Sequence, residues 1–221
     1  IDEAHNLPKA AYQQLTLSLD NRSLNYILDR IDPKHSHSAR WNNKIRALAG
    51  LHPNFEINRS SLVGDINHAR DVIKSFFDKM TSNAHHHFNK DAKYSTKIII
   101  DDLVEHFSPL ESELNTVKKS IHAIRNQIRK IREDLLDIDE TKEDFLELHQ
   151  LFDRGESSLS DIIVLIDALT INQNIEYVYW FEGVFKIVSG NTQLVVTVNM
   201  APIEPGNGLA TSNFKPNDYF I

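Results

Sequence analysis

The fold is decided by the stretch from Leu110 to Ile138, which reads LESELNTVKKSIHAIRNQIRKIREDLLDI. Its apolar residues are separated alternately by four and three positions, a 3.5-residue repeat that is typical of a helix packed along another helix. They are Leu110, Leu114, Val117, Ile121, Ile124, Ile128, Ile131, Leu135 and Ile138. Ser108-Pro109-Leu110-Glu111 combines a capping box with a proline in the first turn, so we expect the helix to begin there.

A second heptad series follows after a polar link from Asp139 to Lys142. It comprises Phe145, Leu148, Phe152, Gly155, Leu159, Ile162, Ile166 and Leu169. Two such helices with a short link between them predict an antiparallel coiled-coil hairpin. A helix of about 30 residues is roughly 45 Å long, so we expect this hairpin to project as an arm. Gly155 in its seam indicates either a close approach of two backbones or a weak point.

The flanking sequence predicts further helices and a small sheet. Thr16–Asp20 alternates in polarity like a strand, and Asn21 is the expected N-cap of a helix that ends at Asp32-Pro33. Ser60 or Ser61 is the expected cap of a longer helix. Near the C-terminus, three β-rich runs around Gly183 and Gly190-Asn191 predict an antiparallel sheet, namely Tyr177–Phe181, Val184–Val188 and Gln193–Val198. The expected fold class is therefore mainly α (α+β).

Composition excludes several classes of protein. The chain has 221 residues, a formal charge of −7 and no cysteine. The lack of cysteine excludes a disulfide scaffold, thiol catalysis and thiolate metal sites within the chain. No apolar run approaches the roughly 20 residues of a membrane helix, and the first residues lack a basic signal-peptide region. We expect a cytoplasmic protein with no membrane partner. Because the chain starts on Ile1 and ends on Tyr219-Phe220-Ile221, we also expect a piece of a larger protein.

The sequence opens with a motif for nucleotide hydrolysis, Ile1-Asp2-Glu3-Ala4-His5-Asn6-Leu7. An apolar residue before Asp-Glu-Ala-His is the pattern of a helicase Walker B box. Asp2 is the candidate ligand of a Mg²⁺ ion that bridges ATP phosphates. Glu3 is placed to orient or deprotonate the attacking water, and His5 to relay nucleotide state. The phosphate-cradling partner motif Gly-x-x-x-x-Gly-Lys-Ser/Thr is absent, so we expect no ATP hydrolysis by the chain alone.

The continuation Asp-Glu-Ala-His-Asn-Leu resembles motif II of the DinG/XPD group of superfamily 2 DNA helicases. In that family a long helical insertion, the arch domain, follows motif II, and the chain then returns to the first helicase domain. The resemblance implies helicase-domain residues at 1–20, an arch domain at 21–174 and a returning β-rich segment at 175–221. It further implies a parent that uses ATP and Mg²⁺ to move 5′→3′ on single-stranded DNA, with Asp2, Glu3 and His5 as catalytic residues. Such an arch contributes to enclosing the strand and separating it from its complement.

The first long helix carries its charge unevenly. Between residues 118 and 132 all the charged side chains are basic: Lys118, Lys119, Arg125, Arg129, Lys130 and Arg132. Residues 133–153 are predominantly acidic. The basic group can line a path for single-stranded DNA, or it can pair with acidic residues across the hairpin. We favour the pairing, because charge runs on long helices are usually solvated faces.

A metal site and a non-catalytic role have weaker support in the sequence. His85-His86-His87 are metal-ligating residue types, but adjacent positions in a polar loop lack the shaping of a metal site. The alternative to a helicase fragment is a non-catalytic helical coiled-coil interaction module, which differs from it by having no nucleotide-binding motif upstream.

Overall fold

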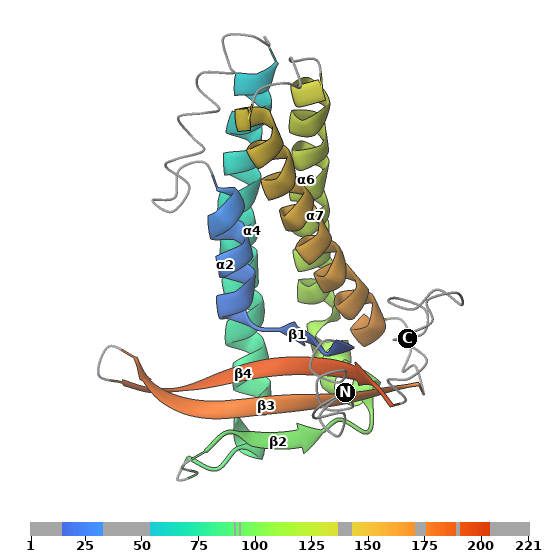
Figure 1. Cartoon of the computed structure of the whole chain (residues 1–221). Helices are drawn as coiled ribbons and strands as arrows, with labels where there is room; N and C mark the ends of the chain where they lie inside the picture. Colours follow the sequence, from blue (N-terminus) through green and yellow to red (C-terminus); the bar gives the residue numbers. More distant parts are fainter. Residues whose placement is uncertain are drawn as a thin grey trace, which may run out of the picture.

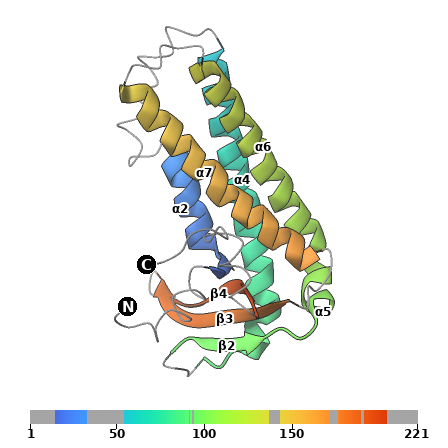
Figure 2. The same cartoon turned by 45° about the vertical axis from the view of Figure 1, so that its right-hand side comes forward.

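The structure is a computed structural model that describes residues 15–32, 54–90, 92, 94–136, 143–170, 176–188 and 191–203. Within them, four helices of eleven residues or more stand side by side on a small antiparallel sheet (Figures 1 and 2). These helices are α2 (Asn21–Ile31), α4 (Phe55–Ala84), α6 (Glu111–Leu136) and α7 (Glu143–Thr170). The prediction of a mainly helical fold with a small antiparallel sheet is confirmed.

The predicted hairpin is formed by α6 and α7, which run in opposite directions in Figure 1. Its heptad positions are buried wherever the structure describes their side chains, and six of them on α6 have no exposed surface: Leu114, Val117, Ile121, Ile124, Ile128 and Ile131. The hairpin does not project by itself. Helix α4 packs along α6, and α2 packs against both α7 and α4, because α4 and α2 carry apolar stripes of their own that need burial.

Three predicted helix starts differ from the observed ones. Asp20, not Asn21, caps α2, and its carboxylate accepts the Ser23 backbone N–H at 2.9 Å. Helix α4 begins at Phe55, well before Ser60, and Glu56 pairs with Arg59 in its first turns. The capping box at Ser108 does not mark a change from non-helical chain to helix, because the residues before it are already helical.

Ser108 instead lies in a continuous run of short helical segments. Helix α5 (Leu103–Phe107) is capped by Asp102, whose carboxylate accepts the backbone N–H groups of Val104 at 2.8 Å and Glu105 at 3.2 Å. The 3₁₀ turn η4 (Ser108–Leu110) then leads directly into α6. Proline is tolerated at Pro109 because it lies in the first turn of η4, where its missing N–H is not required.

Gly155 permits a close approach between helices, the first of the two predicted roles. A Cβ built at residue 155 would lie 2.7 Å from Cγ2 of Ile31. The partner is therefore α2, whereas the heptad pattern alone had placed Gly155 in the seam with the preceding helix.

The sheet has the strand order β1-β4-β3-β2, with every neighbouring pair antiparallel. Its strands are β1 (Leu17–Leu19), β2 (Thr96–Ile99), β3 (Tyr177–Val188) and β4 (Asn191–Pro202). Val188 pairs with Asn191, which confirms the predicted hairpin at Gly190-Asn191. Gly183 lies within β3 and pairs with Val196. The ring of Phe88 packs so closely on Gly183 that an added Cβ would lie 2.4 Å from it.

One continuous hydrophobic core joins the sheet to the helices. Tyr179 and Phe181 of β3 are buried in it, as expected for aromatic residues of a sheet core. The first and last described strands are neighbours: Leu17 pairs with Met200 and Leu19 with Val198. Because this pairing is antiparallel, the backbone leading into β1 and the backbone leading out of β4 lie at the same end of the two strands.

The described helices include none with an apolar stretch long enough to cross a bilayer.

Candidate nucleic-acid interface

The predicted Walker B residues Asp2, Glu3 and His5 belong to residues 1–14, which lie outside the described part of the chain. Their roles, and the Mg²⁺ and ATP that they imply, stay predictions. The six basic residues predicted as a DNA path all lie on α6 and are described.

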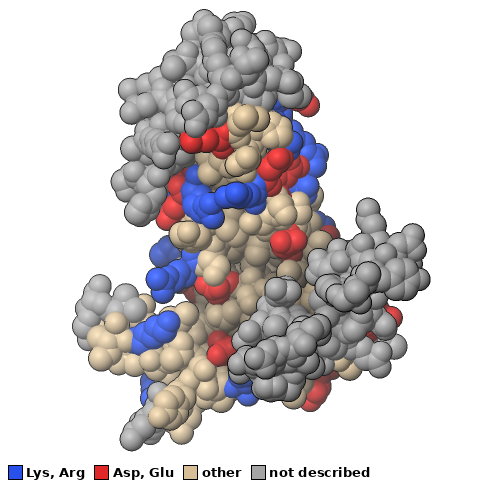
Figure 3. All heavy atoms as spheres, in the orientation of Figure 1, with Lys and Arg blue, Asp and Glu red and all other residues tan. Residues whose placement is uncertain are grey.

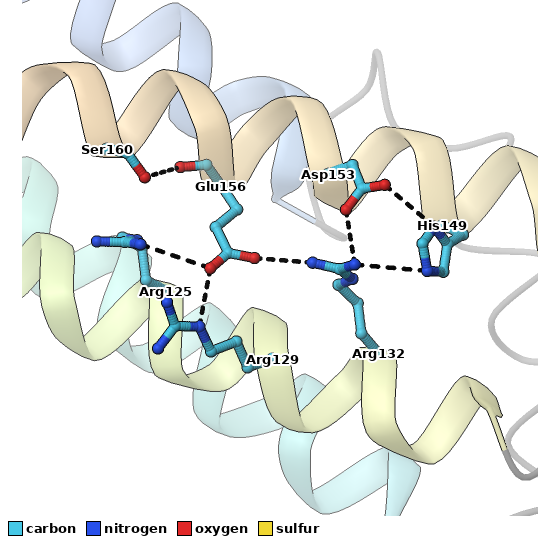
Figure 4. A network of polar contacts seen from close by, with 7 residues as sticks. All are labelled: Arg125, Arg129, Arg132, His149, Asp153, Glu156 and Ser160. Carbon is cyan, nitrogen blue, oxygen red and sulfur yellow. Dashed lines mark hydrogen bonds and ion pairs between the residues drawn. The ribbon is translucent and has the colours of Figure 1, made fainter.

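Most of these basic residues are paired with α7, and Glu156 is the centre of the arrangement (Figure 4). Its carboxylate accepts the Arg129 Nε–H at 2.8 Å through Oε1 and the Arg132 Nη1–H at 2.8 Å through Oε2. Arg125 Nη2 lies 3.5 Å from the same Oε1. The Glu156 side chain is only 14% exposed, so three guanidinium groups converge on one largely buried carboxylate.

Further contacts extend this arrangement along the hairpin. Arg132 Nη2 lies 2.7 Å from Oδ1 of Asp153, and the other oxygen of Asp153 lies 3.2 Å from His149 Nδ1. Nearer the sheet, Lys118 pairs with Asp167. Four of the six predicted basic residues therefore contact acidic residues of α7, and the favoured interpretation, pairing across the hairpin, is confirmed for them.

The electrostatics of Glu156 follow from this crowding of positive charge. Burial alone would raise the pKa of its carboxyl group, because a buried carboxylate loses hydration. The hydrogen bond from Arg129 and the charges of Arg129, Arg132 and Arg125 outweigh burial and hold the pKa of Glu156 below its ordinary value. Glu156 is thus an ionised residue that partly offsets the charge of three arginines of α6.

The remaining two predicted residues, Lys119 and Lys130, are exposed and form no ion pair with a described residue. They lie eleven positions apart on α6. Two separated lysines do not make a continuous basic path by themselves, and the DNA path on α6 stays a prediction.

Sequence analysis missed a second group of cations, on α2 and α7. Arg22, Arg30 and Arg154 are exposed, and none forms an ion pair with a described residue. Tyr26, which is 61% exposed, lies between the two arginines of α2. The available signal was the spacing of four residues from Arg22 to Tyr26 and from Tyr26 to Arg30, which places all three on one helix face.

The histidine run forms a different kind of cluster. His85–His87 make the 3₁₀ turn η3 at the end of α4. Together with Glu105 and His106, His86 and His87 line a depression of about 500 Å³ beside Phe181. Within the described ranges no three His, Cys, Asp or Glu side chains are arranged to hold a metal ion.

Comparison with known proteins adds no relative: neither a protein-family model nor a curated protein sequence matches this chain.

Proposed function

We propose that the chain is the arch-like module of an ATP-dependent DNA helicase that resembles the DinG/XPD group, with the Walker B box at its start. The observation that carries the proposal is the order of Asp2-Glu3-Ala4-His5 followed by a long helical body. In the proposed parent, Asp2 holds Mg²⁺, Glu3 handles the attacking water and His5 couples nucleotide state to movement. The parent is proposed to act 5′→3′ on single-stranded DNA in the cytoplasm.

The arrangement of the first and last strands supports an insertion between two parts of a host domain. An inserted module must take the chain out of its host and bring it back to nearly the same place. The pairing of Leu17 with Met200 gives this module two neighbouring connections, since paired strands lie about 4.8 Å apart. The four helices extend from the sheet as one packed body (Figure 1).

The proposal is tested on the full-length gene product. A Gly-x-x-x-x-Gly-Lys-Ser/Thr motif is expected in the coding sequence upstream of Ile1, since phosphate binding requires it. Glu3→Gln is expected to lower DNA-stimulated ATP hydrolysis by about 10²- to 10⁴-fold, the usual contribution of a positioned general base. Glu133→Gln, an exposed acidic residue on α6, is the matched control and should leave turnover unchanged. Unchanged turnover in Glu3→Gln would remove the catalytic proposal.

The non-catalytic interaction module remains the second candidate, and one observation favours it. Four of the six basic residues of α6 are paired with Glu156, Asp153 or Asp167, as expected of a scaffold rather than a DNA track. A coding sequence without the phosphate-binding motif, together with a full-length product that hydrolyses no ATP, would establish this candidate over the helicase.

A further inference from the structure

A small pocket lies between α2 and α7, outside the predicted basic track. Its volume is about 110 Å³, and its walls include Ile27 of α2 and Leu151 and Gly155 of α7. Because Gly155 has no side chain, α2 approaches α7 closely beside it. Cavities of about 150 Å³ are known to accept a benzene ring, so this smaller apolar recess has room for part of a flat ring.

The rim of the pocket carries an aromatic ring and two arginines. Tyr26, which is 61% exposed, lines the pocket together with Arg30 and Arg154. The guanidinium carbon of Arg30 lies 5.8 Å from the centre of the Tyr26 ring. Figure 3 shows Lys and Arg side chains gathered over α2 and the facing part of α7, with Asp and Glu side chains beside them.

The acidic residues closest in sequence to these arginines are held by other cations. Asp29 and Asp32 each lie 2.7 Å from the guanidinium group of Arg70 on α4, which ties the end of α2 to the bundle. Asp153 lies 2.7 Å from Arg132. Arg30 and Arg154 form no ion pair with a described residue, so their positive charge is directed to solvent at the pocket rim.

An aromatic face, an apolar recess and two arginines together match the chemistry of a nucleotide. Bases stack on tyrosine rings in single-strand binding proteins, and arginines hold phosphates. Arg22 extends the site by two turns from Arg30, a distance of about 12 Å along the helix, which covers some three stacked nucleotides. A peptide of acidic residues alone would satisfy the arginines but would leave the ring and the recess unused.

We propose that the α2–α7 pocket binds a single-stranded nucleic acid, with one base on Tyr26 and the flanking phosphates on Arg30 and Arg154. The proposal deepens the proposed function and rests on it for the choice of nucleic acid as ligand. It moves the strand from the paired arginines of α6 to arginines of α2 and α7 that form no ion pair with a described residue.

The test measures fluorescence anisotropy of labelled dT20 and rU20 oligonucleotides with the 221-residue chain over a range of salt concentrations. Tyr26→Ala is expected to weaken binding by about tenfold to a hundredfold, the loss of one stacked base. Tyr26→Phe should restore affinity, because the ring alone stacks. The double variant Arg30→Gln/Arg154→Gln should lower the slope of log K against log salt by about 1.4, the value for two phosphate contacts on a single strand.

The matched control is Lys119→Gln/Lys130→Gln, which removes the same charge from exposed positions on α6. It should change affinity far less than the arginine pair. Equal losses in both double variants, with Tyr26→Ala unchanged, would show binding by net charge alone and overturn the proposal. It is also overturned if neither oligonucleotide binds, or if poly-glutamate competes fully and Tyr26→Ala has no effect.

Binding of either oligonucleotide through Tyr26 supports the pocket, and the ratio of the two affinities identifies DNA or RNA as the strand. The helicase proposal is tested by a different measurement, the ATP hydrolysis of the full-length product with Glu3→Gln. Failure of the helicase proposal can therefore be told apart from failure of the pocket proposal. Loss of oligonucleotide binding in the pocket variants, in a protein whose hydrolysis does not depend on Glu3, would keep the pocket and remove the helicase.

Discussion

Gly155 of α7 lies against Ile31 of α2, and a Cβ at residue 155 would be 2.7 Å from Ile31 Cγ2. Cγ2 is fixed to the branched Cβ of isoleucine, so it cannot swing aside like the end of a flexible chain. The distance between α2 and α7 at this point is therefore set by the absence of one methyl group.

Gly155→Ala is expected to destabilise the protein although alanine favours helix. The gain in helix propensity is about 0.5–1 kcal/mol, whereas overpacking a well-packed contact costs about 1–3 kcal/mol. The free energy of unfolding should fall by up to about 2 kcal/mol in urea denaturation.

Gly64→Ala on α4 is the matched control, because nothing lies within 4 Å of the Cβ that it adds. This variant should be more stable than the parent chain by about 0.5–1 kcal/mol. If both variants were stabilised equally, the close contact at Ile31 would have no energetic weight.

Glu156→Gln is expected to lower the free energy of unfolding by about 1.5–3 kcal/mol, the usual value of hydrogen bonds between charged groups. The loss leaves Arg125, Arg129 and Arg132 without their common carboxylate. The pKa of Glu156 is lowered on folding, so its contribution is full well above pH 4.5 and is lost as pH falls through the lower folded value. Acid denaturation curves should converge for the two proteins at low pH; a constant difference down to pH 2 would contradict this.

Asp161→Asn is expected to stabilise the chain slightly near neutral pH. Burial raises the pKa of the Asp161 carboxyl group, and no cation among the described residues offsets it. A raised pKa means that ionisation above about pH 4 opposes folding, so the neutral amide removes an unfavourable charge. The expected gain is at most about 0.5 kcal/mol, as for other surface substitutions. It should vanish in acid below pH 3, which thermal melts at several pH values would reveal.

The lowered pKa of His87 predicts that the protein loses stability on mild acidification. Burial first, and then the charges of His86 and His106, lower the pKa of His87, while Glu105 acts in the opposite direction. Its contribution to stability is therefore present above pH 6.5 and is lost as pH falls. The drop in Tm between pH 7.5 and pH 5.5 should be smaller in His87→Gln than in the parent chain, and an equal drop in both would contradict the prediction.

The helical part of the fold was predictable because heptad spacing reports directly on burial. Every described heptad position of α6 from Leu114 to Ile131 is buried. The pattern says that a face is covered but does not say by which element. Hence α4 was not foreseen as a second partner of α6, and Ile31 was not foreseen as the neighbour of Gly155. Helix starts were wrong where another local cap came earlier in the sequence, as at Asp102, from which short helical segments continue through Ser108 into α6.

The candidate site shows the same limit for charged residues. Six basic residues in sequence marked α6 as a track, yet their partners Glu156 and Asp167 lie 24 or more residues away. A run of residues with the same charge can be recognised from the sequence. Only the folded hairpin shows which of these residues form ion pairs. Arg30 and Arg154, which form no ion pair within the described residues, are far apart in sequence, so no linear pattern joined them.

The pairing of Leu17 with Met200 has a mechanical consequence. A pull that separates the backbone before β1 from the backbone after β4 acts across the ladder at one end. It therefore loads the hydrogen bonds between these two strands one after another, as in opening a zipper, instead of shearing them together. The three residues of β1 and the burial of Leu19 in the core that the sheet shares with the helices resist such tension. The entry and the exit of the module are therefore held together by side-chain burial as well as by the short ladder between β1 and β4.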